Sequence, residues 1–256
     1  MTDAAPQTAP QTATLRRELV ETATTVAAAL AIALVLRVVV FQPFTIPSSS
    51  MEPGVRTGDY VIAAKWSYGW SRASLPFNPP LPAGRLFATA PRRGDVIVFL
   101  LPRDPSQTYV KRLIGLPGDR VQIRGGQVWV NGQAIPRQAV GLTEDPEAPG
   151  RRVMQVAEPR PDGHRYVTYD AGPGHEGDDT GVYVVPAGHY FFMGDNRDNS
   201  LDSRWPRAEQ GVDMVPAENL IGRAELVLVS WQPGASVLKP WTWLDLRPSR
   251  MFKPIV

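Results

Sequence analysis

The sequence has no cysteine and few lysines and histidines, and each shortage excludes a class of chemistry. Without cysteine, the 256-residue chain has no disulfide framework, no thiol nucleophile and no thiolate metal site. The net charge is only +2, and no dense basic cluster is present, which argues against a nucleic-acid groove. The 27 basic residues comprise four lysines and 23 arginines. A lysine at a strand position is therefore unusual in this chain.

One segment has the length and composition of a membrane span. From Thr22 to Phe41 the residues are apolar or small, and Arg37 is the one charge among them. Twenty helical residues extend over roughly 30 Å, the thickness of a hydrocarbon core. Arg37 lies near the far end, where a long side chain reaches the interface. We therefore predict one membrane anchor helix over residues 15–41.

The residues before this segment predict its orientation in the membrane. Arg16 and Arg17 precede it, and basic residues favour the cytoplasmic side, so we expect the rest of the chain outside. Residues 1–14 are rich in Ala, Thr, Gln and Pro, which predicts a disordered tail. The alternatives are a cleaved signal peptide and a buried helix of a soluble protein. The first lacks its small-x-small cleavage site here.

Short strands separated by turns are predicted beyond the anchor. The 22 Gly and 26 Pro favour turns over a helical bundle. Asn131-Gly132 is typical of a two-residue type I′ hairpin. Residues 137–180 are polar and rich in Pro, Gly and Asp, and we expect a loop-rich insertion there. The pattern predicts an all-β sandwich or barrel, with strands at 59–64, 95–101, 109–115, 127–135, 181–185, 189–193 and 224–231.

An aromatic loop follows the first of these strands. Trp66, Tyr68, Trp70 and Phe77 lie in a Pro-rich stretch that ends at Pro91. Amphipathic rings suit the headgroup depth of a membrane, but packing on the protein core explains them equally well. The sequence leaves both interpretations open.

Three consecutive serines at 48–50 stand between Pro47 and Pro53, soon after the apolar segment. A hydroxyl on a stiffened backbone beside a bilayer is a candidate nucleophile, and it needs a positioned base. The usual base is histidine. The chain's histidines lie in the polar insertion or open a strand, and none has an acidic neighbour that would obviously orient it: His164, His175 and His189.

Lys111 is the other candidate base. On a strand it shares a face with Tyr109 and Leu113, while Arg112 points to the opposite face. Apolar surroundings lower the pKa of a lysine, so that it can accept a proton, whereas arginine stays charged. A lysine whose charged end remains at the surface is the competing interpretation.

A run of acids and arginines extends from Gly194 to Arg204. It is no calcium loop, because Arg197 occupies the third ligand position and Pro206 stands where the bidentate Glu belongs. The run contains three acids, Asp195, Asp198 and Asp202. We expect them to cap turns and to form ion pairs with Arg197 and Arg204.

Taken in order, four stretches resemble the bacterial type I signal peptidases. The first is the serine stretch Ile46–Met51, followed by Pro53 and Gly58-Asp59. The C-terminal tail from Arg247 is also similar to one branch of the family. The other three motifs are Arg93–Phe99, Tyr109–Asp119 and Gly194–Arg204. The resemblance covers roughly residues 37–232 and is weakest in the insertion. Glu52 and Gly54-Val55 depart from the family's usual residues.

The resemblance implies a role for each matching residue. Ser50, directly before Met51, would be the nucleophile and Lys111 the general base. Ser48 would donate its hydroxyl to the oxyanion hole beside the Ser50 N–H, and Ser200 would orient the lysine. Two further groups are implied: a structural ion pair, Asp202 and Arg204, and the lining of shallow pockets for small side chains, Phe44, Ile46, Val55, Tyr109 and Val110.

The resemblance also implies a fold and a function. The fold would be an all-β catalytic domain over residues 42–256, with a smaller β cap at about 124–186. The activity would be removal of signal peptides from exported preproteins after small residues, by a Ser-Lys dyad without metal or other cofactor. The site would lie on the outer face of the cytoplasmic membrane. The alternatives are another Ser-Lys processing peptidase, a non-catalytic membrane-anchored β module and a transport-accessory protein.

Overall fold

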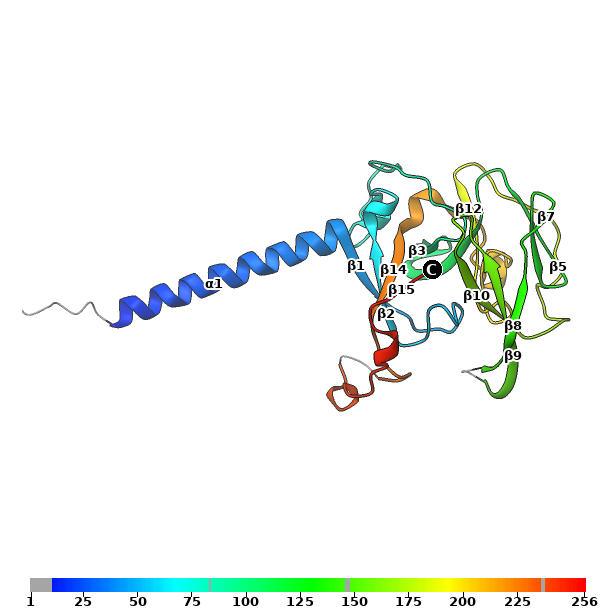
Figure 1. Cartoon of the computed structure of the whole chain (residues 1–256). Helices are drawn as coiled ribbons and strands as arrows, with labels where there is room; N and C mark the ends of the chain where they lie inside the picture. The colour runs from blue at the N-terminus through cyan, green and yellow to red at the C-terminus, as the bar shows by residue number, and fades with distance from the viewer. Residues whose placement is uncertain (1–10, 83, 146–147, 236–237) are drawn as a thin grey trace, which may run out of the picture.

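The computed structural model describes residues 11–82, 84–145, 148–235 and 238–256. Helix α1, Gln11–Val35, continues into a π-helical turn, Leu36–Val40, and β1 follows at once. The segment Leu15–Val40 is long and apolar enough to cross a membrane, and none of its most apolar part is buried in the protein. The helix projects away from the β domain (Figure 1).

The N-terminal boundary differs from the prediction. Residues 11–14 were assigned to a tail but are helical, because Ala, Thr and Gln extend the helix that the apolar run begins. The remainder of the expected tail, residues 1–10, lies outside the described residues. At the other end, Phe41 belongs to strand β1 and not to the helix.

An antiparallel eight-stranded sheet forms the body of the domain. Its path runs β1-β2-β14-β3-β4-β12-β13, and β15 pairs with β14. The strands, in chain order, are β1 Phe41–Thr45, β2 Asp59–Ala64, β3 Val96–Leu101, β4 Asp104–Gly115, β12 His189–Met193, β13 Val215–Pro216, β14 Leu220–Ser230 and β15 Lys253–Pro254.

The apolar sequence of β3 is explained by its central position in this sheet. Every residue of β3 is buried, because β3 lies between β14 and β4 and is covered on both faces. A strand in this position carries no polar alternation. The predicted strand at 109–115 is longer in the structure and begins at Asp104. Polar residues at its start gave no apolar signal, but pairing with β3 holds them extended, as in Leu100 opposite Thr108.

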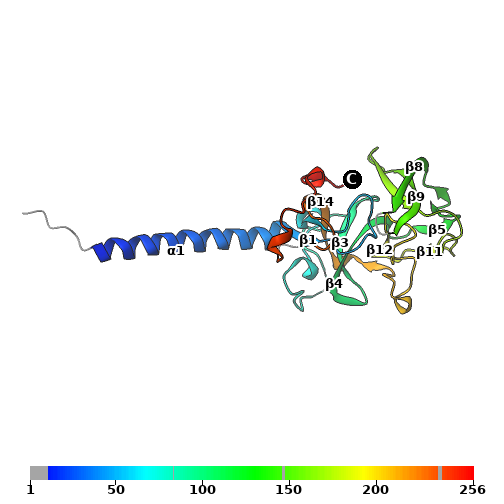
Figure 2. The ribbon, with the colours of Figure 1, turned by 90° about the horizontal axis from the view of Figure 1, so that it is seen from below.

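Two small sheets lie at the end of the domain away from α1 (Figure 1, Figure 2). One has the order β11-β5-β6-β7 and the other β10-β9-β8. Their strands are β5 Arg120–Arg124, β6 Gln127–Val130, β7 Gln133–Ala134, β8 Gln138–Asp145, β9 Ala148–Pro159, β10 Arg165–Asp170 and β11 Tyr183–Val184. We propose that these sheets make up the cap expected at about 124–186.

In the cap, the predicted type I′ turn is confirmed, whereas the predicted loop-rich insertion is wrong. Asn131 and Gly132 connect β6 to β7 with φ of 53° and 78°, as a type I′ turn requires. Residues 137–180 are not mainly loop, because β8, β9 and β10 occupy most of them. Inward side chains such as Val156 and Tyr166 are buried, and so are the polar Glu158 and Thr168, whereas many other polar residues of the region are exposed.

Some residues of the aromatic loop pack on the protein core, and others are exposed as a membrane contact would require. Tyr68 is buried, and its hydroxyl donates to Asp95 Oδ2 at 2.9 Å. Trp66 is 44% exposed and packs edge-on against Phe41, whereas Phe77 is fully exposed. The loop is therefore neither wholly a core element nor wholly a surface patch.

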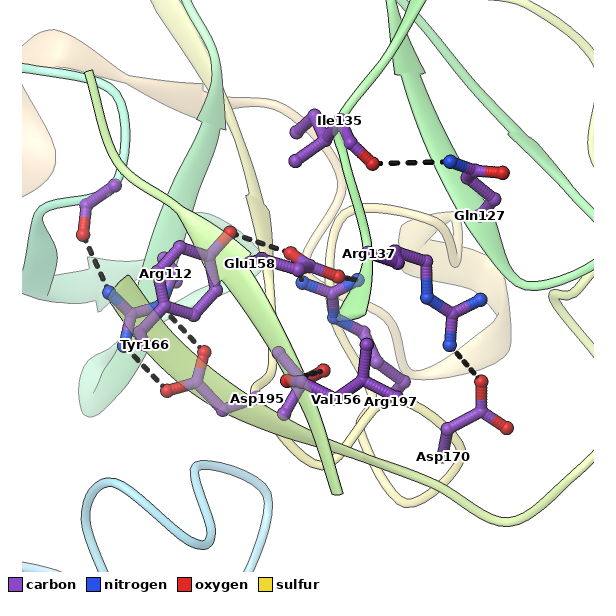
Figure 3. A network of polar contacts seen from close by, with 12 residues as sticks. Arg112, Gln127, Ile135, Arg137, Val156, Glu158, Tyr166, Asp170, Asp195 and Arg197 are labelled. Carbon is purple, nitrogen blue, oxygen red and sulfur yellow. Dashed lines mark hydrogen bonds and ion pairs between the residues drawn. The ribbon is translucent and has the colours of Figure 1, made fainter. Parts of the chain in front are cut away.

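A buried network of charges joins the cap to the main sheet (Figure 3). Arg112 of β4 donates to both oxygens of Asp195, at 2.6 and 2.7 Å, and its guanidinium lies 3.8 Å from the ring centroid of Tyr166 in β10. Arg197 donates to Glu158 of β9 at 2.8 and 2.6 Å. The cap is thereby fixed against the strand that carries Lys111.

The partners within the acidic run are only partly those predicted. Arg204 pairs with Asp202 at 2.9 Å, as expected. The expectation that Arg197 pairs with an acid of its own run is wrong, since its partner, Glu158, comes from the cap. Asp198 accepts the Ala171 N–H at 2.7 Å. The sequence run alone could not show that a cap strand would lie beside it.

Candidate active site

A tight loop between β1 and β2 presents the serines. The loop is closed by two backbone hydrogen bonds of 2.9 Å, from Ile46 N to Asp59 O and from Gly58 N to Ile46 O. Met51 is buried, and Ser50 beside it is half-buried. Burial of Met51 anchors the loop, so that the neighbouring Ser50 side chain is left at the protein surface.

Lys111 of β4 contacts this serine, although β14 and β3 lie between β2 and β4 in the sheet. Its Nζ and the Ser50 Oγ are hydrogen-bonded, although the residues are 61 positions apart. The lysine side chain is buried, with 3% of the residue exposed, and Nζ lies 5.8 Å from the ring centroid of Tyr109. The strand alternation predicted from the sequence therefore places these two side chains on one face.

The environment of Lys111 lowers the pKa of its amine, so that the neutral form is reached at a lower pH than in a free lysine. Burial lowers its pKa from 10.5 to about 8, and the positive charge of Arg204 acts in the same direction. The carboxylates of Asp202 and Asp195 oppose the shift only in part. A neutral amine accepts the hydroxyl proton in the same hydrogen bond in which an ammonium donates.

The Gly194–Arg204 run holds the serine loop in place. Asn196 N donates to Ser50 O at 3.2 Å, and Asn199 Nδ2 donates to Ser49 Oγ at 3.0 Å. A β-carbon at Gly194 would collide with Ser50 O and Ser200 Oγ. Sequence reasoning assigned no role to Gly194, Asn196 or Asn199, although all belong to the motif that it singled out.

The remaining expected serines differ in their positions. Ser48 is exposed, and its Oγ lies 3.4 Å from Ser50 Oγ, so both hydroxyls face the same space. Ser200 is buried beside the dyad, but no hydrogen bond joins it to Lys111, and its Oγ has no partner among the described residues. The expected orienting bond from Ser200 is therefore absent.

The ion pair behind the dyad is fully enclosed. Asp202 and Arg204 are joined at 2.9 Å, with side-chain exposures of 0% and 3%, and the carboxylate also accepts the Gly194 N–H at 3.0 Å. Burial raises the pKa of the Asp202 carboxyl, but the Arg204 guanidinium outweighs it and holds that pKa below its usual value. The pair fixes the run that supports the serine loop.

A cleft of about 920 Å³ opens over Ser50 and Lys111. It is lined by four of the five predicted pocket residues, Phe44, Ile46, Tyr109 and Val110. The fifth, Val55, is a correction: it has no exposed surface and packs in the core with Met51. A loop residue five positions after the nucleophile turns inward here, which the motif alone did not reveal.

The cap contributes a wall of this cleft that the sequence did not indicate. His175 and Glu176 line the cleft together with Trp205. A β-carbon at Gly177 would lie 3.3 Å from the Trp205 ring, so this cap loop packs on that indole. Nothing in the sequence indicated that His175 or Glu176 would lie at the serine loop, because only the folded cap brings them there. Across the described ranges, no group of three or more His, Asp or Glu residues is arranged to hold a metal ion.

Comparisons with known proteins identify relatives of this chain. A family model described as "Signal peptidase, peptidase S26" matches residues 19–231. A Rickettsia typhi protein named "Signal peptidase I" is 40% identical over 240 residues, which covers 86% of this chain and 87% of the relative. A Rickettsia canadensis protein of the same name is 39% identical over 238 residues, with coverages of 86% and 87%.

Among solved structures, the chain is similar to a signal peptidase I from Enterococcus faecalis V583. The two are 27% identical, and the match covers 53% of this chain and 97% of the other with a TM-score of 0.30. The all-β class of the present chain follows from its own strand pairings.

Proposed function

The chain belongs to the signal peptidase family, peptidase S26, and on this premise we propose that Ser50 is its nucleophile and Lys111 its general base. The protein is a serine endopeptidase that removes signal peptides from preproteins. The observation that carries the residue assignment is the hydrogen bond between Lys111 Nζ and Ser50 Oγ. Both atoms border the cleft, and the burial of Lys111 favours the unprotonated amine.

The reaction proceeds in two halves. In the first, neutral Lys111 takes the Ser50 proton while Oγ attacks the scissile carbonyl, and the resulting ammonium then protonates the leaving amine. The products are the released mature chain and an ester between Ser50 and the signal peptide. In the second, Lys111 takes a proton from a water molecule as its oxygen attacks the ester carbonyl. The bond from this carbonyl to Ser50 Oγ then breaks, the lysine ammonium returns the proton to Oγ, and the signal peptide leaves with a new C-terminal carboxyl group.

The cleft suits an extended peptide. Only residues 112–115 of β4 pair with β12, so the edge of β4 at Gln107–Val110 is left to border the cleft. The end of β1, with Phe44 and Thr45, and the following Ile46 also border it. A peptide strand can hydrogen-bond to such an edge, and the lining includes the apolar side chains Phe44, Ile46 and Val110 that small residues could contact. We therefore assign cleavage after small side chains to this cleft.

The helix gives the enzyme and its substrate a common location. The apolar segment Leu15–Val40 anchors the protein in a membrane. We propose a single-pass arrangement in the cytoplasmic membrane, with the N-terminus in the cytoplasm and the β domain outside, as the preceding Arg16 and Arg17 favour. A preprotein held by its own apolar segment would then meet the cleft at a high effective concentration.

The pH dependence of cleavage tests the base. Because the pKa of Lys111 is lowered to about 8, the neutral amine is the minority form at pH 6 and the majority form above pH 8. We expect kcat/KM to rise with pH by about tenfold per unit well below the pKa and to level off above it. The measurement is initial-rate cleavage of a preprotein in detergent, with sequencing of the new N-terminus. A profile governed only by a group near pH 4 would contradict a lysine base.

Loss of the Ser48 hydroxyl is expected to lower kcat by about 10²–10³-fold, because one of two oxyanion donors disappears while the dyad remains. The companion donor is the Ser50 N–H. Ser48→Ala and the control Ser106→Ala, which removes an exposed hydroxyl outside the cleft lining, would be compared in the same assay. An unchanged kcat in Ser48→Ala would remove Ser48 from the oxyanion hole.

A further inference from the structure

The junction between the anchor helix and the β domain has side-chain caps. The last carbonyls of a helix lack partners within the helix. Here Val38 O accepts a hydrogen bond from Lys65 Nζ at 3.0 Å, and Val39 O accepts one from Trp70 Nε1 at 2.7 Å. Both donors come from the aromatic loop, about 30 residues further along the chain. The turn that ends the helix is therefore held by a segment of the catalytic domain.

The loop that supplies these donors is itself fastened to the main sheet. Lys65 Nζ also donates to Ser74 O, and Ser71 Oγ donates to Glu218 O at 2.8 Å. Arg85 donates to Ala217 O at 2.8 Å and Leu220 O at 2.6 Å, at the start of β14. β14 pairs with both β2 and β3. Direct contacts thus connect the helix end to the strands that form the centre of the domain.

Burying the Lys65 ammonium costs free energy unless its N–H groups donate hydrogen bonds. Only 1% of the residue is exposed, and lysine is rarely buried without partners. Burial, followed by the charge of Arg37, lowers its pKa to about 8. Its partners are carbonyl oxygens, and it does not contact the serine loop or line the cleft. Its position therefore points to a role at the helix end rather than in the chemistry.

We propose that Lys65 and Trp70, bonded to Val38 and Val39, form a clasp that fixes the β domain on its anchor helix and so sets the height and tilt of the cleft above the bilayer. The proposal rests on the proposed function. A preprotein is held by its own apolar segment, so its scissile bond lies at a restricted height. A domain free to pivot at Val40 and Phe41 would meet that bond less often.

Two substrates distinguish a role in positioning the cleft from a general role in stability or catalysis. The first is a preprotein reconstituted with the full-length enzyme in liposomes. The second is a soluble peptide that spans the same cleavage site without the apolar segment. The variants are Lys65→Met, Trp70→Phe and both together, which remove the donors and keep most of the side-chain volume. The matched control is Trp66→Phe, since no hydrogen bond from that indole is found in the described part of the chain.

We expect the double variant to lower kcat/KM for the preprotein by about tenfold and for the soluble peptide by less than about twofold. Trp66→Phe should leave both values unchanged. A four-residue Gly-Ser insertion between Val40 and Phe41, which keeps every clasp residue, should reproduce the selective loss. It also keeps the test decisive where a Lys65 variant does not fold.

Unchanged cleavage of the preprotein by the double variant and by the insertion variant would overturn the clasp. An equal loss on both substrates in Trp70→Phe would also overturn it, because a positioning role affects only the membrane-held substrate. Failure of the unmodified enzyme to cleave either substrate would contradict the proposed function itself, which separates the two results.

Discussion

Ser50→Ala and Lys111→Ala are each expected to lower the rate of preprotein cleavage by about 10⁴-fold or more, since removing a nucleophile or its base eliminates the covalent route. Lys111→Arg should not restore activity, because a guanidinium stays protonated and cannot accept the Ser50 proton. The two alanine substitutions should not be additive, because the residues act as one unit in the same step.

The measurement is single-turnover cleavage in detergent, with thermal unfolding recorded for each variant to show that the fold is retained. Lys65→Met is the control, and it is compared with the Ser50 and Lys111 variants on the soluble peptide, where the clasp does not contribute. Lys65 and Lys111 are both nearly inaccessible to solvent, at 1% and 3% exposure, and both have a pKa lowered to about 8, but the hydrogen bonds of Lys65 Nζ go to carbonyl oxygens. Appreciable cleavage by Ser50→Ala would contradict the assignment of the nucleophile.

Arg112→Met is expected to reduce the free energy of unfolding by about 3–5 kcal/mol, because it leaves the Asp195 carboxylate buried without its counter-charge. The two side chains are each 1% exposed and share two hydrogen bonds. Burial opposes the charge of Arg112, but Asp195 outweighs it and raises the pKa of the guanidinium. The substitution also removes the contact with the Tyr166 ring in the cap.

Chemical denaturation of the full chain in detergent measures this effect. Arg223→Met is the control, because its pair with Glu225 is partly exposed and such pairs contribute about 0–1 kcal/mol. The double substitution Arg112→Met with Asp195→Leu should recover much of the loss, since no unpaired charge remains. Equal, small effects of Arg112→Met and Arg223→Met would show that the buried pair is not essential for holding the cap.

Local patterns were sufficient for much of the fold. The apolar run indicated the helix, and Asn131-Gly132 indicated its hairpin, because both depend on residues adjacent in sequence. The strands of the 137–180 region escaped notice because their sequences are rich in polar residues, and pairing with neighbouring strands holds them extended. Val55 was misplaced for a related reason, since the motif fixes its spacing from Ser50 but not the direction of its side chain.

The sequence by itself indicated the apolar membrane segment and the all-β class, and through the family motifs it predicted the pair Ser50 and Lys111. It could not distinguish the two lysines physically, since Lys65 and Lys111 are both buried and both have a pKa lowered to about 8. Only the tertiary structure brings one to a serine hydroxyl and the other to the end of the anchor helix. Burial alters the basicity of a lysine, but contacts between residues distant in sequence decide what that basicity acts on.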